Sequence, residues 1–461
     1  MYKVIYFFTA LIIFVLQPEK YSFFNHEYNF FLSLVYLFLV TVFLFQQRMR
    51  DKNWLRFDVV FLLGYTIVHF QIPFLASIGI EPSRPSFVWI NKEVVNYATW
   101  MSTVTISLWM LGYSLFSSRT KVQKQAQKFK VNYTLFDPLL IIVFTGFLVT
   151  VGKNFLSGAY DVNSWGDGAT YFLLILEVLL YLRVIYFFKE INSNSSIRNI
   201  INTFLSHKLF VAVITTYTLL FFLTGSRGEI LRILLVTAFA YSIYIKSLSF
   251  RFIIISVLIG SFIFTIMGLG RGRVATDLGH QSILQRGYTA LQETDKRDNF
   301  TEELASSVRI QYRAIDTVPE SHPYLYGLTY VGTIVGAIPF ASGFVISALD
   351  IPYCYKGSAS FFTCLGQGNN ITYGEGSEIL ADIYINFSIY GVFIIMLAFG
   401  AFIGKATIGV KQKNFNYILI YAMLLIAALS INRGTILYAY KDIIYILVFH
   451  YILSGQLKWR L

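Results

Sequence analysis

Long apolar runs alternate with short polar segments along the whole chain. The runs lie at about 3–16, 30–46, 57–79, 95–116, 135–151, 169–188, 208–223, 228–245, 251–269, 379–403, 415–431 and 437–454. Most are close to the roughly 20 residues that a helix needs to cross a bilayer. The pattern predicts an all-α polytopic integral membrane protein with about 12 transmembrane helices. The first run lacks a small-residue cleavage site and is followed by Pro18, so we expect a retained helix rather than a signal peptide.

Composition supports a membrane protein and excludes the main soluble classes. Of the 461 residues, 56% are hydrophobic and only 13% are charged, whereas a soluble domain averages about 25% charged residues. So few charged side chains cannot cover the surface of a soluble protein of this size. The composition therefore excludes a soluble enzyme, a disordered chain and a secreted disulfide scaffold.

The basic residues indicate the orientation of the predicted helices. The formal net charge is +12, and 21 of the 29 basic residues outside the long polar segment 270–378 fall on one side of the predicted membrane. Because cytoplasmic loops are enriched in Lys and Arg, that side is expected to be the cytoplasm, with both termini there. The excess of positive charge then needs no nucleic acid to explain it, and we expect no nucleic-acid binding.

The spacing of the runs divides the chain into three regions. Residues 1–269 are expected to form transmembrane helices 1–9, residues 270–378 a large outside loop, and residues 379–461 helices 10–12. Within the loop, 281–294 and 300–316 have helical periodicity, whereas the apolar stretch 330–349 is broken by glycines and Pro339. That stretch is more typical of a re-entrant or interfacial segment than of a full span.

Arginines beside glycines occur at three helix ends on the predicted outer face. Arg227 lies between the seventh and eighth runs, Arg271 and Arg273 follow the ninth, and Arg433 lies between the last two. The planar guanidinium matches pairs of phosphate oxygens, and turn N–H groups add further donors. The three clusters together favour a binding site for a phosphorylated anion. Ordinary turn residues whose cations snorkel to the interface remain the alternative.

Two carboxylates precede or begin the tenth run. Glu378 and Asp382 are four residues apart and share one face of the predicted helix. Either can serve as a general base or orient a sugar hydroxyl, or can pair with a nearby arginine. His322 in the long loop is a further candidate base, although a single loop histidine is more often structural. No spacing of His, Cys, Asp or Glu indicates a metal site.

Other chemistry-bearing residues lie within the runs and in the loop. Glu177, with Arg183 six residues later, and His69 fall inside predicted spans; we interpret them as local structural pairs in preference to a proton path. Cys354 and Cys364 are the two cysteines of the chain, and both fall in the outside loop. In an oxidising periplasm we expect them to form a disulfide.

Several short motifs resemble the family of Wzy-type O-antigen polymerases. They are the turn at 225–228 (GSRG), residues 324–330 (YLYGLTY) followed by Ile338-Pro339, and residues 382–387 (DIYINF) followed by Tyr390-Gly391. Family members often have Glu in place of Asp382, a glycine in place of Ser388, and a basic residue in place of Phe340. The sequence of helices, late large loop and few final helices also fits this family.

The resemblance implies a function and roles for the candidate residues. It implies an inverting glycosyltransferase of the bacterial inner membrane, with its active site facing the periplasm and without cofactor or metal. The growing polysaccharide on undecaprenyl pyrophosphate would be transferred to a new lipid-linked repeat unit. Besides these substrates and the lipid bilayer, it implies a chain-length regulator protein as a partner.

Each candidate residue then has an expected role. Asp382 is the first choice of base, with Glu378 and His322 behind it. Arg227, Arg271, Arg273 and Arg433 would hold the departing pyrophosphate. Tyr324, Tyr326 and Tyr384 would stack on sugars, although tyrosines at this depth also serve as interface anchors.

Three other functions remain open from the sequence. An O-antigen ligase shares the general plan, but we would expect a stronger histidine motif in its loop. A lipid-linked oligosaccharide flippase is a transporter; we would expect shorter loops and charges spread through its spans. A structural partner in an export complex is the third.

Overall fold

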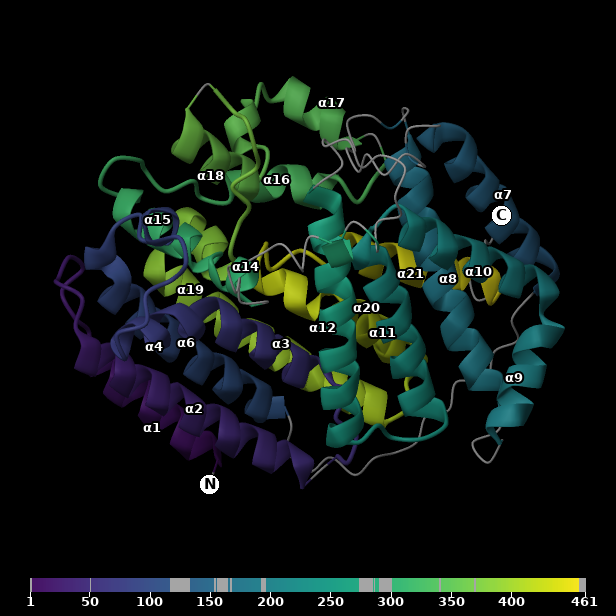
Figure 1. Cartoon of the computed structure of the whole chain (residues 1–461), viewed down its shortest axis with the longest axis horizontal. Helices are drawn as coiled ribbons and strands as arrows, with labels where there is room; N and C mark the ends of the chain where they lie inside the picture. Colours follow the sequence, from purple (N-terminus) through teal and green to yellow (C-terminus); the bar gives the residue numbers. More distant parts are fainter. Residues whose placement is uncertain are drawn as a thin grey trace. The chain divides into compact units, whose positions relative to one another are not determined.

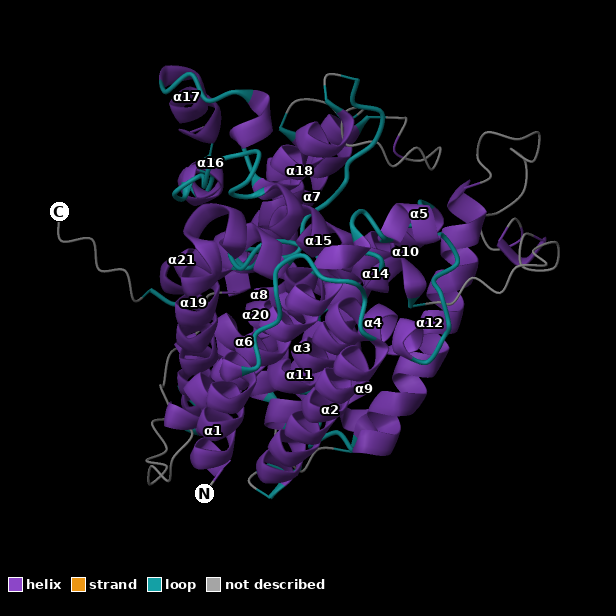
Figure 2. Cartoon of the chain, turned by 90° about the vertical axis from the view of Figure 1, so that its left-hand side faces the viewer, coloured by secondary structure: helices purple, strands orange, loops and turns teal. Residues whose placement is uncertain are grey.

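The computed structural model describes residues 2–49, 51–116, 133–152, 155, 165, 168–191, 196–272, 285, 287–289, 301–339, 341–368 and 370–455. This described part consists of helices and loops and contains no strand (Figure 2). The chain forms two compact units. Unit 1 comprises Met1–Asp51, Phe57–Gln127 and Thr301–Lys441, and unit 2 comprises Lys52–Arg56, Lys128–Phe300 and Asp442–Leu461.

Unit 1 combines the first helices of the chain with the late ones (Figure 1). Its longer helices are α1 (Tyr2–Val15), α2 (His26–Arg48), α3 (Phe57–Tyr65), α6 (Val95–Phe116), α19 (Ile379–Lys411) and α20 (Phe415–Asn432). A π-helical turn, η1 (Thr66–Phe70), joins α3 to α4 (Gln71–Ser77). Short helices fill the segments between: α5 (Pro85–Val88), η2 (Lys92–Val94), α14 (Glu302–Ala305), α15 (Val308–Thr317), α16 (Leu328–Val335), α17 (Ala341–Ala348), η5 (Tyr353–Tyr355) and α18 (Ser358–Gln367).

Unit 2 is built from the middle of the chain and its C-terminal helix. Its helices are α7 (Tyr133–Val151), α8 (Ala169–Glu190), α9 (Ile197–Ser206), α10 (Lys208–Leu223), α11 (Arg227–Tyr244), α12 (Phe250–Gly272) and α21 (Tyr440–Leu453). α21 begins at the last two residues of unit 1. The predicted helix at 281–294 lies mostly outside the described residues.

All twelve apolar runs of the sequence coincide with described helices, but fewer satisfy the length and hydropathy of a span. Within the described ranges, five helices are long and apolar enough to cross a membrane: His26–Arg48, Phe57–Ser77, Ala169–Glu190, Ile379–Lys411 and Phe415–Asn432. The number rises to six if the bent pair Arg198–Ser206 and Lys208–Leu223 forms one span. The chain is therefore a polytopic helical membrane protein, and the number of twelve spans stays a prediction.

Glycines bring α6 and α19 into close backbone contact. A Cβ at Gly112 of α6 would lie 2.0 Å from the Leu397 carbonyl oxygen of α19. Conversely, a Cβ at Gly400 or Gly404 of α19 would lie 2.0 Å and 2.4 Å from carbonyl oxygens of α6. Small residues four apart are the usual device for close packing of helices in membranes. This close contact sets the direction of α19 relative to α6.

α19 is divided by a break at Phe387 and Ser388. Ser388 has φ 60° and ψ −173°, a conformation that is essentially confined to glycine. A glycine at this position would adopt that backbone geometry without strain. The break separates a short, fully buried first segment, 379–386, from the apolar remainder of the helix.

The segments before α2, before α6 and before α19 meet at one end of unit 1. Lys20, before α2, forms an ion pair with Glu320 at 2.6 Å. Two segments before α6 are hydrogen-bonded to the same region: Asn91 donates to Asp316 at 2.7 Å, and the Ser83 N–H donates to Glu302 at 2.6 Å. The short helices α16, α17 and α18 gather near this end in both views (Figures 1 and 2). The start of α19, which carries the candidate carboxylates, lies among them.

Candidate functional site

The two longest family-like motifs are in direct contact with one another. Leu325 and Tyr326 donate their N–H groups to the carbonyl oxygens of Ile385 and Asn386, at 2.9 and 3.1 Å. The Asn386 side chain accepts from the Gly327 N–H at 3.0 Å. These bonds satisfy carbonyls that the break in α19 leaves without a helical partner. Residues 324–330 and 382–387 thus form one local structure, which the sequence did not predict.

Asp382 lies at the centre of this structure and is 1% exposed. Its Oδ2 accepts a hydrogen bond from the Tyr330 hydroxyl of α16 at 2.8 Å. The hydroxyls of Ser358 and Thr435 and the Ile436 backbone point towards the carboxylate, yet Oδ1 has no hydrogen bond of regular geometry. A buried carboxylate oxygen without a donor of good geometry is costly, so Oδ1 can accept a further hydrogen bond.

The turn that carries Arg433 packs against the same carboxylate. Thr435 and Ile436, which follow Arg433 by two and three residues, are the groups that approach Asp382. The Arg433 side chain is partly exposed and pairs with Glu303 of α14 at 3.6 Å. A candidate base and a candidate phosphate ligand therefore occur in adjacent structures of unit 1.

Glu378 has a different environment from Asp382. It is the N-cap of α19, and its two oxygens accept from the Leu380 and Ala381 N–H groups at 2.7 and 2.9 Å. A side-chain oxygen on these N–H groups is what stabilises a helix start. The same carboxylate lies 3.2 Å from Nε2 of His69. Both side chains are fully buried.

The other ring nitrogen of His69 faces Gln311. Gln311 Nε2 donates to the Ala98 carbonyl at 3.2 Å and to Ser102 Oγ at 3.0 Å, so its Oε1 is the acceptor for His69 Nδ1 at 3.2 Å. Nδ1 therefore carries hydrogen in either charge state of the ring. The contact between Nε2 and the Glu378 oxygen is attractive only if a proton also lies between those two atoms. The pair is a buried structural link between the π-helical turn and α19.

The sequence identified His69 and Glu378 separately but gave no sign that they meet. The π-helical turn at Thr66–Phe70, which carries His69, was also not predicted. Such turns insert one extra residue and are frequent at functional sites. Gln311, Tyr330 and Thr435 were likewise missed, because no spacing relates them to the carboxylates that they approach.

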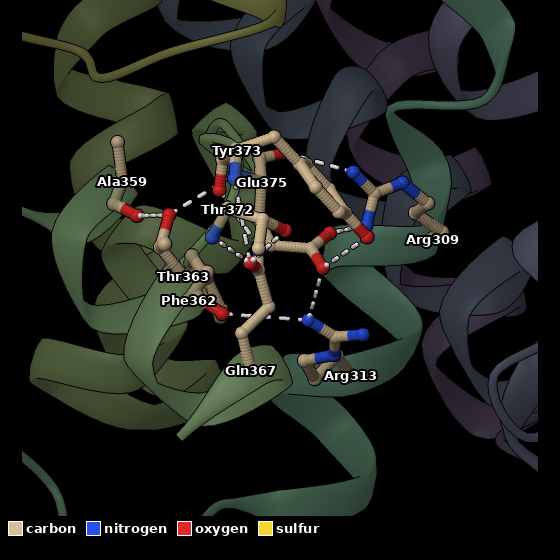
Figure 3. A network of polar contacts seen from close by, with 9 residues as sticks. All are labelled: Arg309, Arg313, Ala359, Phe362, Thr363, Gln367, Thr372, Tyr373 and Glu375. Atoms are coloured by element: carbon tan, nitrogen blue, oxygen red, sulfur yellow. Dashed lines mark hydrogen bonds and ion pairs between the residues drawn. The ribbon is translucent and has the colours of Figure 1, made fainter. Parts of the chain in front are cut away.

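A second polar network holds the loop that leads into α19 (Figure 3). The Glu375 carboxylate pairs with Arg309 and lies 3.5 Å from Arg313, both on α15. It also accepts from the Tyr373 hydroxyl at 3.2 Å, and its own N–H donates to Thr363 of α18 at 3.0 Å. This network fixes the chain three residues before the Glu378 cap.

The charges of this network favour the ionised carboxylate. Burial raises the pKa of Glu375, but the hydrogen bond and charge of Arg309, together with Arg313, outweigh it and hold the pKa below its ordinary 4.5. Burial conversely lowers the pKa of Arg309 from its ordinary 12.5. Two guanidinium groups on one carboxylate leave a net positive charge in the loop.

The structure joins Cys354 and Cys364 in a disulfide, with their Cα atoms 5.7 Å apart. It connects η5 to α18 beside His322. The His322 Nε2 lies 3.2 Å from the Tyr355 hydroxyl, and its ring packs edge-on against Phe361 at 5.0 Å. Its hydrogen-bond partners in the described part of the chain are thus loop groups and neither carboxylate.

The three tyrosines expected to stack on sugars differ in exposure. Tyr326 is 82% exposed and has a positive φ of 47°. Tyr324 is half-buried, with its ring 6.0 Å from that of Tyr384. Tyr384 itself is buried and donates its hydroxyl to the Val318 carbonyl at 3.1 Å. In this structure Tyr384 is part of the core, and its ring has no free face for a sugar.

Unit 2 contains its own cluster of charges around the Arg227 turn. Arg227 is half-buried at the first position of α11, and Ser226 and Glu229 form a capping-box sequence in which the two side chains are hydrogen-bonded. Arg232 lies 3.2 Å from Glu229 and 3.4 Å from Glu177 of α8.

Glu177 does not pair with the arginine nearest to it in sequence. It accepts from the Tyr217 hydroxyl at 2.7 Å and pairs with Arg232 of α11. Arg183 instead pairs with Asp137 of α7 at 3.1 Å. Both intramembrane charges therefore form structural pairs between helices of unit 2.

The remaining candidates lie at the limit of the described chain. Arg271 is placed as part of α12 by its backbone, and Arg273 lies outside the described residues. Among the residues that the structure describes, no group of three or more His, Cys, Asp or Glu is arranged to hold a metal ion.

A family model described as O-antigen polysaccharide polymerase Wzy matches residues 3–457 of this chain. Searches of curated proteins and of solved structures gave no significant match. The family match extends through both units and includes every residue discussed above.

Proposed function

Because the chain belongs to the O-antigen polysaccharide polymerase Wzy family, we propose that it is an inverting glycosyltransferase working on two lipid-linked substrates. The donor is the growing polysaccharide on undecaprenyl pyrophosphate, and the acceptor is a new repeat unit on the same lipid. The reaction takes place at the periplasmic face of the bacterial inner membrane. The disulfide between Cys354 and Cys364 supports an oxidising compartment for the loop that contains it.

One observation carries the assignment of the site. Asp382 is buried where the two family-like motifs and the Arg433 turn meet, and its Oδ1 is the one carboxylate oxygen there without a donor of regular geometry. A base must lie within hydrogen-bonding reach of the hydroxyl that it deprotonates. Oδ1 offers such an acceptor, while the Tyr330 hydroxyl holds the other oxygen in place.

The proposed step forms one bond and breaks one. The acceptor hydroxyl oxygen attacks the anomeric carbon of the donor sugar from the face opposite to the pyrophosphate, which inverts the configuration. The hydroxyl proton passes to the Asp382 carboxylate. The bond from the anomeric carbon to the pyrophosphate oxygen breaks, and its electron pair leaves with undecaprenyl pyrophosphate.

The departing pyrophosphate gains negative charge, so a fixed cation lowers the barrier. Arg433 is the first candidate, because its turn contacts Asp382 and its Glu303 partner is exposed enough to be exchanged for a phosphate. Arg227, Arg271 and Arg273 remain further candidates for binding a pyrophosphate. Tyr326, whose ring is exposed, is the best candidate for stacking on a sugar. The family match favours neither a ligase nor a flippase.

The test is a glycan ladder in the native host. The gene is deleted and restored with the wild-type chain, Asp382→Asn or Asp350→Asn, and the lipopolysaccharide is separated on a gel. Asp350 is exposed, so it provides a matched carboxylate-to-amide control. We expect deletion and Asp382→Asn to leave a single repeat unit on the core, and Asp350→Asn to restore the full ladder.

Two other outcomes would contradict the proposal at different levels. A deletion strain with no repeat unit on the core would indicate a ligase or flippase. A full ladder from Asp382→Asn at normal protein abundance would leave the polymerase assignment intact but place the base elsewhere.

A further inference from the structure

We propose that the hairpin formed by α16 and α17 lies in the lipid interface, with α17 resting on the acyl chains of the bilayer. Residues 330–349 contain no charged side chain. Each of the two helices has eight residues, which is about 12 Å at 1.5 Å per residue, well short of a hydrocarbon core of about 30 Å. The hairpin is therefore too short to span and too apolar to favour water.

The exposed surface of the hairpin is apolar. No residue of α17 is buried. Phe344 is 75% exposed, and Ile338 and Leu349 are exposed to 64% and 61%. Contiguous exposed apolar surface of this kind marks a site of contact with lipid or protein.

The hairpin begins where the lipid-facing surface of α19 begins. The Tyr330 ring of α16 lies 5.9 Å from the ring of Phe387, at the break in α19. Beyond the break, Tyr390 and Ile394 are 70% and 67% exposed within a candidate membrane span. Side chains of a span that no protein covers meet acyl chains, so the hairpin continues a surface that is already in lipid.

Residues flanking the hairpin are typical of a membrane interface. Lys356 lies 5.8 Å above the ring of exposed Tyr353. On the other side, Lys441 Nζ lies beside Gly336 at the C-terminal end of α16, 2.7 Å from where a Cβ would be. Tyrosine and lysine are the residues that anchor helices at the level of the lipid headgroups.

A second copy of the chain is a weaker candidate for the occupant of this surface. A stable protein interface uses about 20–30 residues on each side, whereas the large exposed apolar side chains of the hairpin are few. A bilayer imposes no such minimum, since each buried side chain adds its own transfer free energy.

Membrane contact of the hairpin reaches the candidate carboxylate through Tyr330. Tyr330 lies on α16 and donates to Asp382. Lipid that holds α16 and α17 in place therefore also holds the partner of the carboxylate.

The test measures the depth of the hairpin with a single nitroxide. Both native cysteines are in the disulfide, so Phe344→Cys provides one free thiol for a maleimide spin label. The full-length protein is placed in phospholipid nanodiscs without any glycolipid. Matched labels go to Ile394→Cys on the exposed face of α19 and to Ser321→Cys in the polar loop.

We expect the label at 344 to be more accessible to oxygen than to a water-soluble nickel complex, as at 394 and unlike 321. A profile at 344 that matches 321 would overturn the proposal. Spin–spin broadening at 344 that grows with protein concentration would also overturn it, in favour of a second copy. The label requires no activity, so failure here leaves the proposed function unaffected.

Discussion

A pair of buried carboxylates in unit 2 and a pair in unit 1 are neutralised in different ways. In unit 2, Glu177 and Glu229 flank the guanidinium of Arg232. In unit 1, Glu378 and Asp382 are held by backbone N–H groups, a tyrosine hydroxyl and an imidazole. The first arrangement compensates charge with charge, and the second uses donors that are mostly neutral.

The proposed role of Asp382 rests on this difference. A buried carboxylate paired with arginine leaves the cation without its partner when it takes a proton. A carboxylate held by neutral donors can accept a proton without leaving a neighbouring cation unpaired. Glu378 uses both oxygens as a cap, whereas Asp382 has one oxygen without a hydrogen bond of regular geometry, and this is why we propose Asp382 as the base.

The largest effect is expected from removing the cation of unit 2. Arg232→Met leaves two carboxylates without compensation in a mostly buried site, which destabilises proteins by about 3 kcal/mol or more. Thermal unfolding in detergent should show a clearly lowered midpoint. Adding Glu177→Gln and Glu229→Gln to the same variant should recover part of the loss. An unchanged midpoint in Arg232→Met would mean that this cluster is not a structural ion pair.

The next effect concerns Arg433 and catalysis rather than stability. Arg433→Ala should slow polymerisation in membrane vesicles on the order of a hundredfold, the usual loss when one charge-stabilising donor is removed. Arg433→Lys should rescue poorly, because an ammonium cannot grip two phosphate oxygens at once. Glu303→Gln is the control: it releases Arg433 and should keep the rate. Full activity of Arg433→Lys would contradict a bidentate phosphate contact.

Changing Glu378 to the amide sharpens the distinction within unit 1. Glu378→Gln keeps the oxygen that accepts from Ala381 and gains an N–H that can donate to His69, but it no longer accepts from Leu380. Stability should therefore fall slightly, and polymer formation should remain near wild type. Glu378→Ala loses the cap and should lower stability by about 1 kcal/mol. The comparison is with Asp382→Asn, which should stop polymerisation. Equal loss of activity from both amide variants, at equal abundance, would make Glu378 part of the chemistry.

A smaller gain is expected at the break in α19. Ser388→Gly places the residue suited to φ 60° and ψ −173° at that position, and relief of this strain should stabilise the protein by about 1 kcal/mol. The unfolding midpoint should rise, and the glycan ladder should be unchanged. Ser388→Ala keeps the Cβ and should not share the gain. A lower midpoint for the glycine variant would show that the serine side chain stabilises the break.

The smallest effect is a dependence on pH at the Glu375 network. Because the pKa of Glu375 is below its ordinary 4.5 in the folded state, its contribution to stability is complete above about pH 4.5 and is lost as the pH falls through the lowered value. Hydrogen exchange of residues 370–378 should therefore increase in acid, and Glu375→Gln should remove this dependence. An identical acid response in Glu375→Gln would assign it to another group.

The sequence predicted the individual helices well because apolar runs of this length have few alternatives. It also named Asp382, Glu378 and Arg433, since carboxylates and arginines beside apolar runs are unusual enough to be noticed. It placed Asp382 before Glu378 through the family resemblance alone, because the physical difference between the two carboxylates depends on Gln311, His69 and Tyr330. These partners come from distant parts of the chain, and no periodicity relates them.

What the sequence determined by itself is the class of molecule: an all-helical membrane protein of the O-antigen polymerase family. Hydropathy sets the helical membrane architecture, because a bilayer leaves a long apolar segment little choice but a helix, and the resemblance of the short motifs implies the family. Tertiary structure decided which motifs meet. Glycine contacts between α6 and α19 and the break at Ser388 bring residues 324–330 onto Asp382, and such contacts depend on shape and distance rather than on local pattern.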